Sequence, residues 1–425
     1  MGMQSPSVLA IPVILLVAVF LVAGGNLPVA HATGFRSSFA SSRPAGPAAA
    51  QPVADYVSAM VVDPLTGDVY VADWDSSNVT VLNGSTGAVI AEVAVGANPD
   101  AMVLDPYGDV YVANSGSNNL SVISTTTQAL TATIPDGAQP CALAFSTDSR
   151  EVYVANFGSG TVSVIDPATH TVVTSLPVGD GDDAIAGGLP NGDLVVGHWW
   201  GSDQATFIST ASDTIAATVP TPGHNPWSLA VDPPRDEVYA PLNGSGTDTV
   251  GVIDGATDQL VFQIPVGGGP RAVAYDVANG ETYVANLYTN NVSVVDDSTH
   301  AVVATVPVGI EPWVVAVDPV RNLVYVANHG SDNVTVINGS TNQVERSLGT
   351  GSEPSAIAID DANGAVFVSN YGSSNVTTIA LPSTRIPPST GGSSTWVDPW
   401  VLGVAAVVGA AAVVVALRTL HSKVR

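Results

Sequence analysis

The residues best suited to chemistry occur in one part of the chain: Asp182, Asp183, His198, Trp199 and Trp200. Carboxylate oxygens and an imidazole nitrogen can together bind a divalent cation. No second histidine stands at ligand spacing, since His170 and His300 fall in other turns. The sequence therefore predicts no cofactor. The alternative is that this cluster binds a divalent cation. The opposing interpretation is that the fourth repeat has diverged in sequence without gaining a binding site.

A second group of residues could bind a ligand by stacking. Aromatic and polar side chains recur at two equivalent positions of the chain, and the candidates are Trp74, Trp199, Trp227, Arg271 and Trp313. The same positions also hold Phe157, His329 and Tyr371. Such a surface suits a glycan, a peptide or a partner protein. The structural alternative is that these aromatic rings fill gaps between neighbouring units of the fold.

The patterns of common enzymes are missing. The sequence holds no G-x-S-x-G nucleophile elbow and no Gly-rich phosphate loop with its lysine. Its one cysteine, Cys141, excludes an internal disulfide and a cysteine-ligated zinc site, and we expect it to be a small buried residue. These observations favour a protein that binds rather than one that catalyses.

The candidate residues are positioned by a repeat. A short β-rich run ends at Asp73, and equivalent runs end at Asn114, Asn156, His198, Leu242, Asn286, Asn328 and Asn370. The successive gaps are 41, 42, 42, 44, 44, 42 and 42 residues. A period of ~40–45 residues is typical of propeller blades.

Each unit contains four β-rich runs separated by turn residues. In the first unit the runs are SAMVVD (58–63), DVYVAD (68–73), NVTVLN (78–83) and AVIAEVAV (88–95). Four strands joined by tight turns form a meander. The predicted fold is an all-β propeller with eight four-stranded blades over residues 55–381, and seven blades is the alternative. Closure is expected through residues 383–387 or through an N-terminal strand within 33–50.

The repeated DPxxGxVYVAN turn and strand, the NVTVI strand and the VGxxP link together resemble the YVTN-family β-propeller repeat. That family occurs in archaeal surface-layer proteins and exported bacterial proteins. The resemblance covers roughly residues 55–381 and implies the fold and an extracellular setting. The family motif is a framework motif with no catalytic residue to carry over.

Both ends of the chain carry apolar segments. Residues 1–32 read as a signal peptide, with an apolar run at 8–23 and a small-x-small site at 30–32, and a retained anchor is the alternative. Residues 33–54 form a linker or closing strand. Residues 382–399 are a Pro/Ser/Thr/Gly stalk, and 400–417 form an uncharged apolar run long enough for a transmembrane helix. The basic tail 418–425 predicts a cytoplasmic C-terminus.

The net charge is −26, with 11 basic and 37 acidic residues. A surface of this sign repels phosphate backbones, so nucleic acid is excluded as a partner. The expected partners are the membrane, through the C-terminal helix, and glycans or other envelope proteins. Sparse charge with a single lysine would also suit an acidic exterior.

Eight N-x-S/T sequons could carry glycans in an exported chain: Asn78, Asn83, Asn119, Asn243, Asn291, Asn333, Asn338 and Asn375. Five of them share one repeat position, where asparagine also serves the turn.

The sequence thus predicts a non-enzymatic, membrane-anchored cell-surface propeller for binding, adhesion or surface-layer structure. The alternative is an exported metal-dependent hydrolase or lyase with its site in the central channel. Neither the ligand nor the oligomeric state follows from the sequence.

Overall fold

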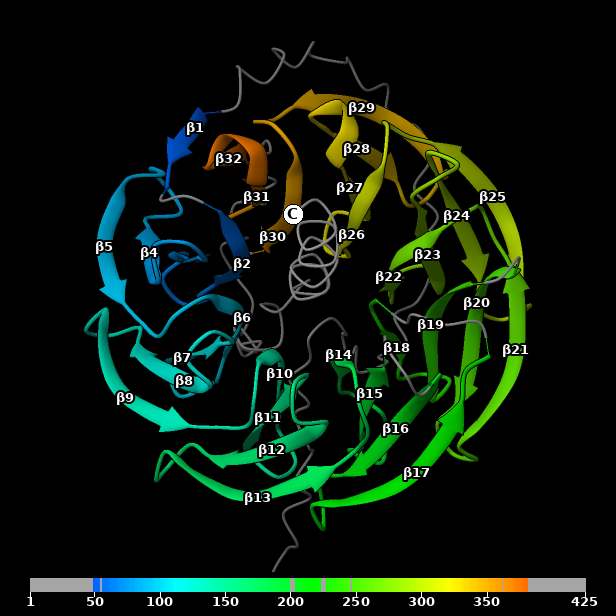
Figure 1. The fold of residues 1–425 in the computed structure, drawn as a ribbon. Helices are drawn as coiled ribbons and strands as arrows, with labels where there is room; N and C mark the ends of the chain where they lie inside the picture. Colours follow the sequence, from blue (N-terminus) through cyan, green and yellow to red (C-terminus); the bar gives the residue numbers. More distant parts are fainter. Residues whose placement is uncertain are drawn as a thin grey trace, which may run out of the picture.

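The computed structural model describes residues 49–53, 56–198, 203–222, 227–244, 247–361 and 363–380. These residues form eight four-stranded antiparallel sheets, arranged as the blades of a ring (Figure 1). The predicted eight-bladed propeller is confirmed, and the alternative of seven blades is wrong. Two single 3-10 turns, η1 (His329–Ser331) and η2 (Tyr371–Ser373), are the helical elements of the described residues.

Each blade runs from the centre of the ring to its rim. The innermost strands are β2 (Val57–Val62), β6 (Pro99–Leu104), β10 (Pro140–Ser146), β14 (Asp182–Ala186), β18 (Ala230–Asp232), β22 (Pro270–Asp276), β26 (Pro312–Asp318) and β30 (Pro354–Asp360). The second strands are β3 (Val69–Asp73), β7 (Asp109–Asn114), β11 (Glu151–Asn156), β15 (Leu194–His198), β19 (Glu237–Gly244), β23 (Glu281–Asn286), β27 (Leu323–Asn328) and β31 (Ala365–Asn370).

The outer half of each blade completes the meander. The third strands are β4 (Asn78–Leu82), β8 (Asn119–Ser124), β12 (Thr161–Asp166), β16 (Gln204–Ser209), β20 (Thr247–Asp254), β24 (Asn291–Asp296), β28 (Asn333–Asn338) and β32 (Asn375–Ala380). The outermost strands are β5 (Val89–Ala94), β9 (Ala129–Pro135), β13 (Thr171–Pro177), β17 (Thr214–Pro220), β21 (Gln259–Pro265), β25 (Ala301–Pro307), β29 (Gln343–Gly349) and, for the last blade, β1 (Ala49–Pro52).

The ring closes through the N-terminal strand. β1 pairs antiparallel with β32, with Ala49 opposite Thr378 and Pro52 opposite Asn375. Of the two closures that the sequence left open, this is the N-terminal one, while residues 383–387 lie outside the described part. The last blade therefore joins two segments distant in sequence, and this pairing ties the two ends of the ring together.

The core is a set of apolar layers between adjacent blades. Both faces of the inner strands are buried, because each sheet lies between two others. The second strands contribute the largest buried side chains, which include a tyrosine at the same position in six blades: Tyr70, Tyr111, Tyr153, Tyr239, Tyr283 and Tyr325. The outermost strands expose most of their residues, as in β13 and β25.

The alternation of strand directions gives the ring two distinct faces. The upper face carries the loops between second and third strands and the links from each blade to the next. The lower face carries the turns between first and second and between third and fourth strands. A β-bulge opens most inner strands on the upper face, and the bulge residues are Ser58, Asp100, Cys141, Asp183, Arg271, Trp313 and Ser355. Bulges re-aim side chains, and three of the sequence-predicted candidates, Asp183, Arg271 and Trp313, stand at these positions.

Candidate functional site

The upper face is held together by a repeated backbone contact between a loop and a link. The N–H of Trp74 donates to the carbonyl of Tyr56 (2.8 Å), and that of His329 donates to Glu311 (2.9 Å). Tyr371 donates to Glu353 in the same way (2.9 Å). These contacts bring the loops and links together on the upper face.

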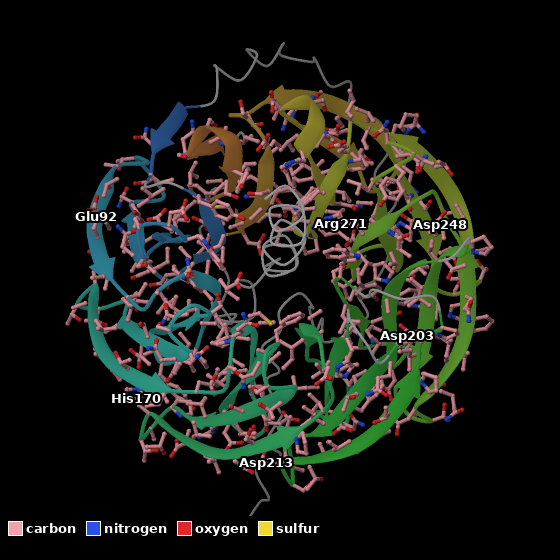
Figure 2. The ribbon with its side chains drawn as sticks, in the orientation of Figure 1. Glu92, His170, Asp203, Asp213, Asp248 and Arg271 are labelled. Carbon is pink, nitrogen blue, oxygen red and sulfur yellow. The ribbon has the colours of Figure 1, made fainter. Side chains whose placement is uncertain are left out.

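Arg271 lies between two tryptophans on this face. Its guanidinium carbon lies 3.5 Å from the ring centroid of Trp313 and 4.5 Å from that of Trp227. Trp313 also stacks on His329, with centroids 4.6 Å apart and planes 23° apart. The stack joins three neighbouring blades, and Figure 2 shows Arg271 on the inner side of the ring. Arg271 is 5% exposed, and a desolvated guanidinium over tryptophan faces is a strong cation–π arrangement.

The stack continues across the closure of the ring. The His329 and Tyr371 centroids lie 6.5 Å apart. Tyr371 meets Tyr56 edge-on at 4.2 Å, and Tyr56 lies 5.9 Å from Trp74. We call the whole series the aromatic arc: Trp227, Arg271, Trp313, His329, Tyr371, Tyr56 and Trp74. It extends from the fifth blade, through the last, to the first.

The arc is largely desolvated and is flanked by carboxylates. Burial lowers the pKa of His329 below its usual value, although Glu353 and Glu311 act in the opposite direction. Burial, together with Tyr371, raises the pKa of Tyr56. Glu311 is exposed and Glu353 is half-buried beside the arc. The arc therefore offers uncharged aromatic surface, one buried cation and hydrogen-bond acceptors at its border.

The arc is compatible with both interpretations of the aromatic residues. Trp227, Arg271 and Trp313 do bridge neighbouring blades, as the structural alternative requires. They also lie together on one face, as a binding surface requires. The sequence did not single out Tyr56 or Tyr288. Tyr288 is 71% exposed and covers Gly269 so closely that a Cβ there would lie 2.5 Å from its ring. In the sequence, the glycine run 267–269 was the feature that could have indicated a side chain packed closely over the backbone there.

The fourth blade shows less of the predicted cluster. Asp182 is paired in register with His198 on β14 and β15. His198 is fully buried, and its Nε2 lies 2.9 Å from Thr206 Oγ1. Trp199 and Trp200, and the side chains of Asp182 and Asp183, lie outside what the structure describes. Within the described ranges, no group of three or more His, Cys, Asp or Glu side chains is placed to hold a metal ion.

Cys141 is buried, with its Sγ 3.5 Å from the carbonyl oxygen of Ala155. It is thus the small buried residue that the sequence predicts.

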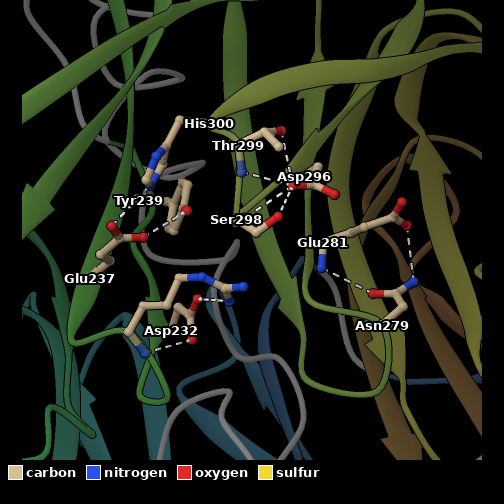
Figure 3. A network of polar contacts seen from close by, with 10 residues as sticks. Asp232, Glu237, Tyr239, Asn279, Glu281, Asp296, Ser298, Thr299 and His300 are labelled. Carbon is tan, nitrogen blue, oxygen red and sulfur yellow. Dashed lines mark hydrogen bonds and ion pairs between the residues drawn. The ribbon is translucent and has the colours of Figure 1, made fainter.

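The lower face carries inter-blade polar contacts. His300 Nε2 lies 2.9 Å from Glu237 Oε1 of the preceding blade, and its ring stacks on Phe262 at 4.0 Å. The Tyr239 hydroxyl donates to the same carboxylate (3.0 Å) (Figure 3). His170 likewise lies 3.8 Å from Asp109. Both histidines therefore lie on the face opposite the arc, where they link blades.

Seven of the eight sequons form two groups, and the eighth, Asn243, lies in β19. At the shared repeat position the asparagine side chain accepts a hydrogen bond from the asparagine that ends the second strand, as in Asn333 from Asn328 (2.7 Å). The same contact occurs at Asn119 (2.9 Å), Asn291 (2.8 Å) and Asn375 (2.7 Å). Asn83 and Asn338 instead lie in turns of the lower face.

Comparison with known proteins shows the fold. No family model matches the chain, and no curated protein matches it. Among solved structures it is similar to Kuenenia stuttgartiensis hydrazine synthase, with 22% identity, a TM-score of 0.54, and coverage of 72% of this chain and 99% of that one.

Two further structures are similar. A dihydro-heme d1 dehydrogenase, NirN in complex with DHE, has 17% identity and a TM-score of 0.60, and the match covers 76% of this chain and 75% of that one. Saccharomyces cerevisiae Sqt1 has 11% identity and a TM-score of 0.68, and the match covers 80% of this chain and 100% of that one. At these identities the likeness is one of architecture alone.

The predicted membrane segment 400–417 and the signal peptide 1–32 lie outside the described residues. In the described ranges, no helix has the length and apolar character needed to cross a membrane.

Proposed function

We propose that this chain is a non-enzymatic cell-surface propeller of the YVTN type that binds glycans through the aromatic arc. It is tethered to the membrane by residues 400–417. The observation that carries the proposal is the continuous aromatic arc on the face opposite the point where the chain leaves the ring.

The path of the chain supports this orientation. β32 runs from the upper to the lower face, so its last residue, Ala380, lies at the lower face. The proposed stalk 382–399 and membrane helix follow directly. A ring held in this way turns its lower face towards the membrane and presents the arc to the exterior.

Glycans fit the chemistry of the arc. The C–H faces of sugars pack on aromatic rings, and their hydroxyls donate to carboxylates. The half-buried Trp227 and Trp74 of the arc supply rings, and the exposed Tyr288 ring, which is not part of the arc, adds one on the same face. Glu311 and Glu353 supply acceptors at the border. Acidic ligands such as phosphate chains are repelled by a chain of net charge −26.

The arrangement of the arc favours binding over catalysis. Its one histidine, His329, stacks on Trp313 and has a lowered pKa. An enzyme site needs a nucleophile or base within hydrogen-bond reach of a partner that activates it. The arc presents ring surfaces instead, which suits recognition.

A glycan array probed with the detergent-solubilised full chain tests the proposal. We expect binding to a subset of glycans, with signals reduced at least tenfold in Trp227→Ala and Tyr288→Ala. Tyr107→Ala is the matched control, because Tyr107 is 60% exposed and lies on the lower face. Equal signals for all three variants, or no bound glycan, would contradict glycan recognition by the arc.

A further inference from the structure

Three aromatic residues of the arc meet where the ring closes. Tyr56 lies in the link into the first blade, Trp74 follows β3, and Tyr371 follows β31. The ring centroids of Tyr56 and Tyr371 are 4.2 Å apart with planes at 81°, and those of Tyr56 and Trp74 are 5.9 Å apart with planes at 37°. All three residues are half-buried, so part of each stays accessible. We call these three residues the closure cluster.

Glu353 is held against the closure cluster by backbone contacts. Its carbonyl oxygen accepts a hydrogen bond from the N–H of Tyr371 (2.9 Å), and its own N–H donates to Asp332 Oδ1 (2.8 Å). Its carboxyl carbon lies 3.0 Å from the point where a Cβ of Gly372 would stand, directly after Tyr371. The Glu353 carboxylate therefore borders the cluster in a defined position.

Further carboxylates act on the same two tyrosines. Burial raises the pKa of both Tyr56 and Tyr371, and Asp75 adds to the rise at each of them. Asp100 acts in the same direction on Tyr56, and Glu353 does so on Tyr371. Asp75 is exposed, and Asp100 is buried. Negative charge from three carboxylates is therefore concentrated beside the rings of the closure cluster.

The described residues offer little positive charge to these carboxylates. Apart from histidines, the basic residues of the described ranges are Arg150, Arg235, Arg271, Arg321 and Arg346. Three of them lie in lower-face turns between first and second strands, and Arg346 lies on the outermost strand β29. Arg271 is thus the one described arginine of the upper face, and its guanidinium is enclosed by two tryptophans. Within the described ranges, no arginine lies over the tyrosine rings of the closure cluster.

We propose that the closure cluster binds an ammonium group, so that the glycan recognised by the arc is an amino sugar. The inference rests on the proposed function and names the class of glycan within it. Aromatic ring faces attract a cation, two rings at right angles can both contact it, and neighbouring carboxylates accept its hydrogen bonds. At the other end of the arc, the guanidinium of Arg271 already lies on ring faces in this way. A chain of net charge −26 also favours the approach of a cationic ligand.

Two tetrasaccharides that differ in a single substituent test the inference. The glucosamine tetramer carries amino groups, whereas the N-acetylglucosamine tetramer carries neutral amides on the same sugar backbone. Isothermal titration calorimetry with the detergent-solubilised full chain measures both affinities in a mildly acidic buffer of low salt, where the amino groups are protonated. We expect the glucosamine tetramer to bind about tenfold more tightly than the acetylated one.

Variants of the chain separate the site from diffuse electrostatic attraction. Asp75→Asn combined with Glu353→Gln should weaken binding of the glucosamine tetramer by about fivefold and leave the acetylated tetramer unaffected. The matched control is Glu92→Gln combined with Glu345→Gln, which removes the same charge from exposed positions on outermost strands; Figure 2 shows Glu92 on the outer side of the ring. Tyr371→Ala changes no charge and should also weaken binding of the glucosamine tetramer.

The outcomes distinguish this inference from the proposed function. Equal affinity for the two tetramers would overturn the ammonium site and leave glycan binding by the arc intact. An equal loss in the Glu92 and Glu345 control, or unchanged affinity in the Asp75 and Glu353 variant or in Tyr371→Ala, would show diffuse attraction and would also overturn it. Binding of neither tetramer would contradict the ammonium site as well, and the glycan array then tests the proposed function separately.

Discussion

The guanidinium carbon of Arg271 lies 3.5 Å from the centroid of the Trp313 ring. Arg271 enters from the bulge of β22, and Trp313 enters from the bulge of β26 in the next blade. Trp227 of the preceding blade covers the guanidinium at 4.5 Å. The buried guanidinium of Arg271 thus brings together residues of three blades near the start of their inner strands. It joins Trp227 to Trp313 within the aromatic arc.

Replacing Arg271 with lysine tests the stack. Arg271→Lys keeps the charge but loses the planar group that lies flat on the rings. We expect the free energy of unfolding to fall by about 1–2 kcal/mol, the scale of a desolvated cation–π contact. Urea titration followed by tryptophan fluorescence measures it. Arg150→Lys is the matched control, because Arg150 is exposed, and an equal loss there would argue against a special role for the stack.

Two tyrosines at one repeat position are expected to respond differently to loss of the hydroxyl. The Tyr283 hydroxyl donates to Glu281 Oε2 (3.0 Å) and also bonds Asn342 Oδ1 of the next blade (3.0 Å). The Tyr70 hydroxyl is buried and has no hydrogen-bond partner among the described residues. Tyr283→Phe should destabilise the ring by about 1–3 kcal/mol, and Tyr70→Phe should be neutral or stabilising. Thermal unfolding of the two variants measures this difference. Equal changes in Tm for Tyr283→Phe and Tyr70→Phe would contradict a stabilising role for the hydrogen bond between blades.

Stability should increase as the solution becomes acidic. Burial raises the pKa of Asp297 and of Asp361 to about 8, and that of Asp105 and of Asp276 to about 6. An unfolded aspartate has a pKa of about 3.9. Between about pH 4 and pH 8 the unfolded chain therefore binds fewer protons than the folded chain, so the free energy of unfolding falls as pH rises. We expect a higher Tm at pH 5 than at pH 8.

Asparagine replacements isolate the groups responsible. Asp297 faces Thr282, Asp232, Tyr239 and Arg235, with one arginine near two carboxylates. Asp297→Asn removes the ionisation, so it should raise Tm at pH 8 and flatten the pH dependence. A shift of about 2–4 °C is expected for each kcal/mol in a chain of this size. A Tm that falls between pH 8 and pH 5 would show that other groups govern the pH response.

Glycan occupancy should differ between the two groups of sequons. Asn333 accepts from Asn328 and donates from Nδ2 to the carbonyl oxygen of Ser331 (2.8 Å). Attaching a sugar to that nitrogen replaces a donor that the loop uses. The Nδ2 of Asn338 donates instead to the exposed side chain of Glu345 (2.9 Å), and that of Asn83 donates to Asp68 Oδ1 (3.4 Å), so a sugar at either position displaces a side-chain contact and not a contact to the loop backbone. Glycopeptide mass spectrometry of the secreted or membrane-bound chain should find Asn338 or Asn83 occupied more often than Asn333, and the reverse order would contradict this reasoning.

The sequence predicted the architecture well because the repeat determines it. The recurrence of VYVAN and the four runs per unit imposed four strands per blade and eight blades, and these depend on local turn chemistry. It also placed Trp227, Arg271 and Trp313 on one face, from the alternation of turns and strands.

Contacts between blades could not be read from the sequence. Tyr56 meets Tyr371 only because the ring closes through β1 and β32, which brings residues about 300 positions apart into contact. The intercalation of Arg271 depends on the register of two bulges. The sequence alone does not show that the apolar residues of the outermost strands are exposed, because this depends on those strands being the edges of their sheets.

Labelling of intact cells tests the central claim, that the arc face is presented outside the cell. The probe is a membrane-impermeant maleimide, and the chain carries Tyr288→Cys, at a position that is 71% exposed on the upper face. We predict labelling of intact cells by this variant and no labelling of the wild-type chain, whose Cys141 is buried. Labelling of Tyr288→Cys that occurs only after the cells are lysed would contradict the account.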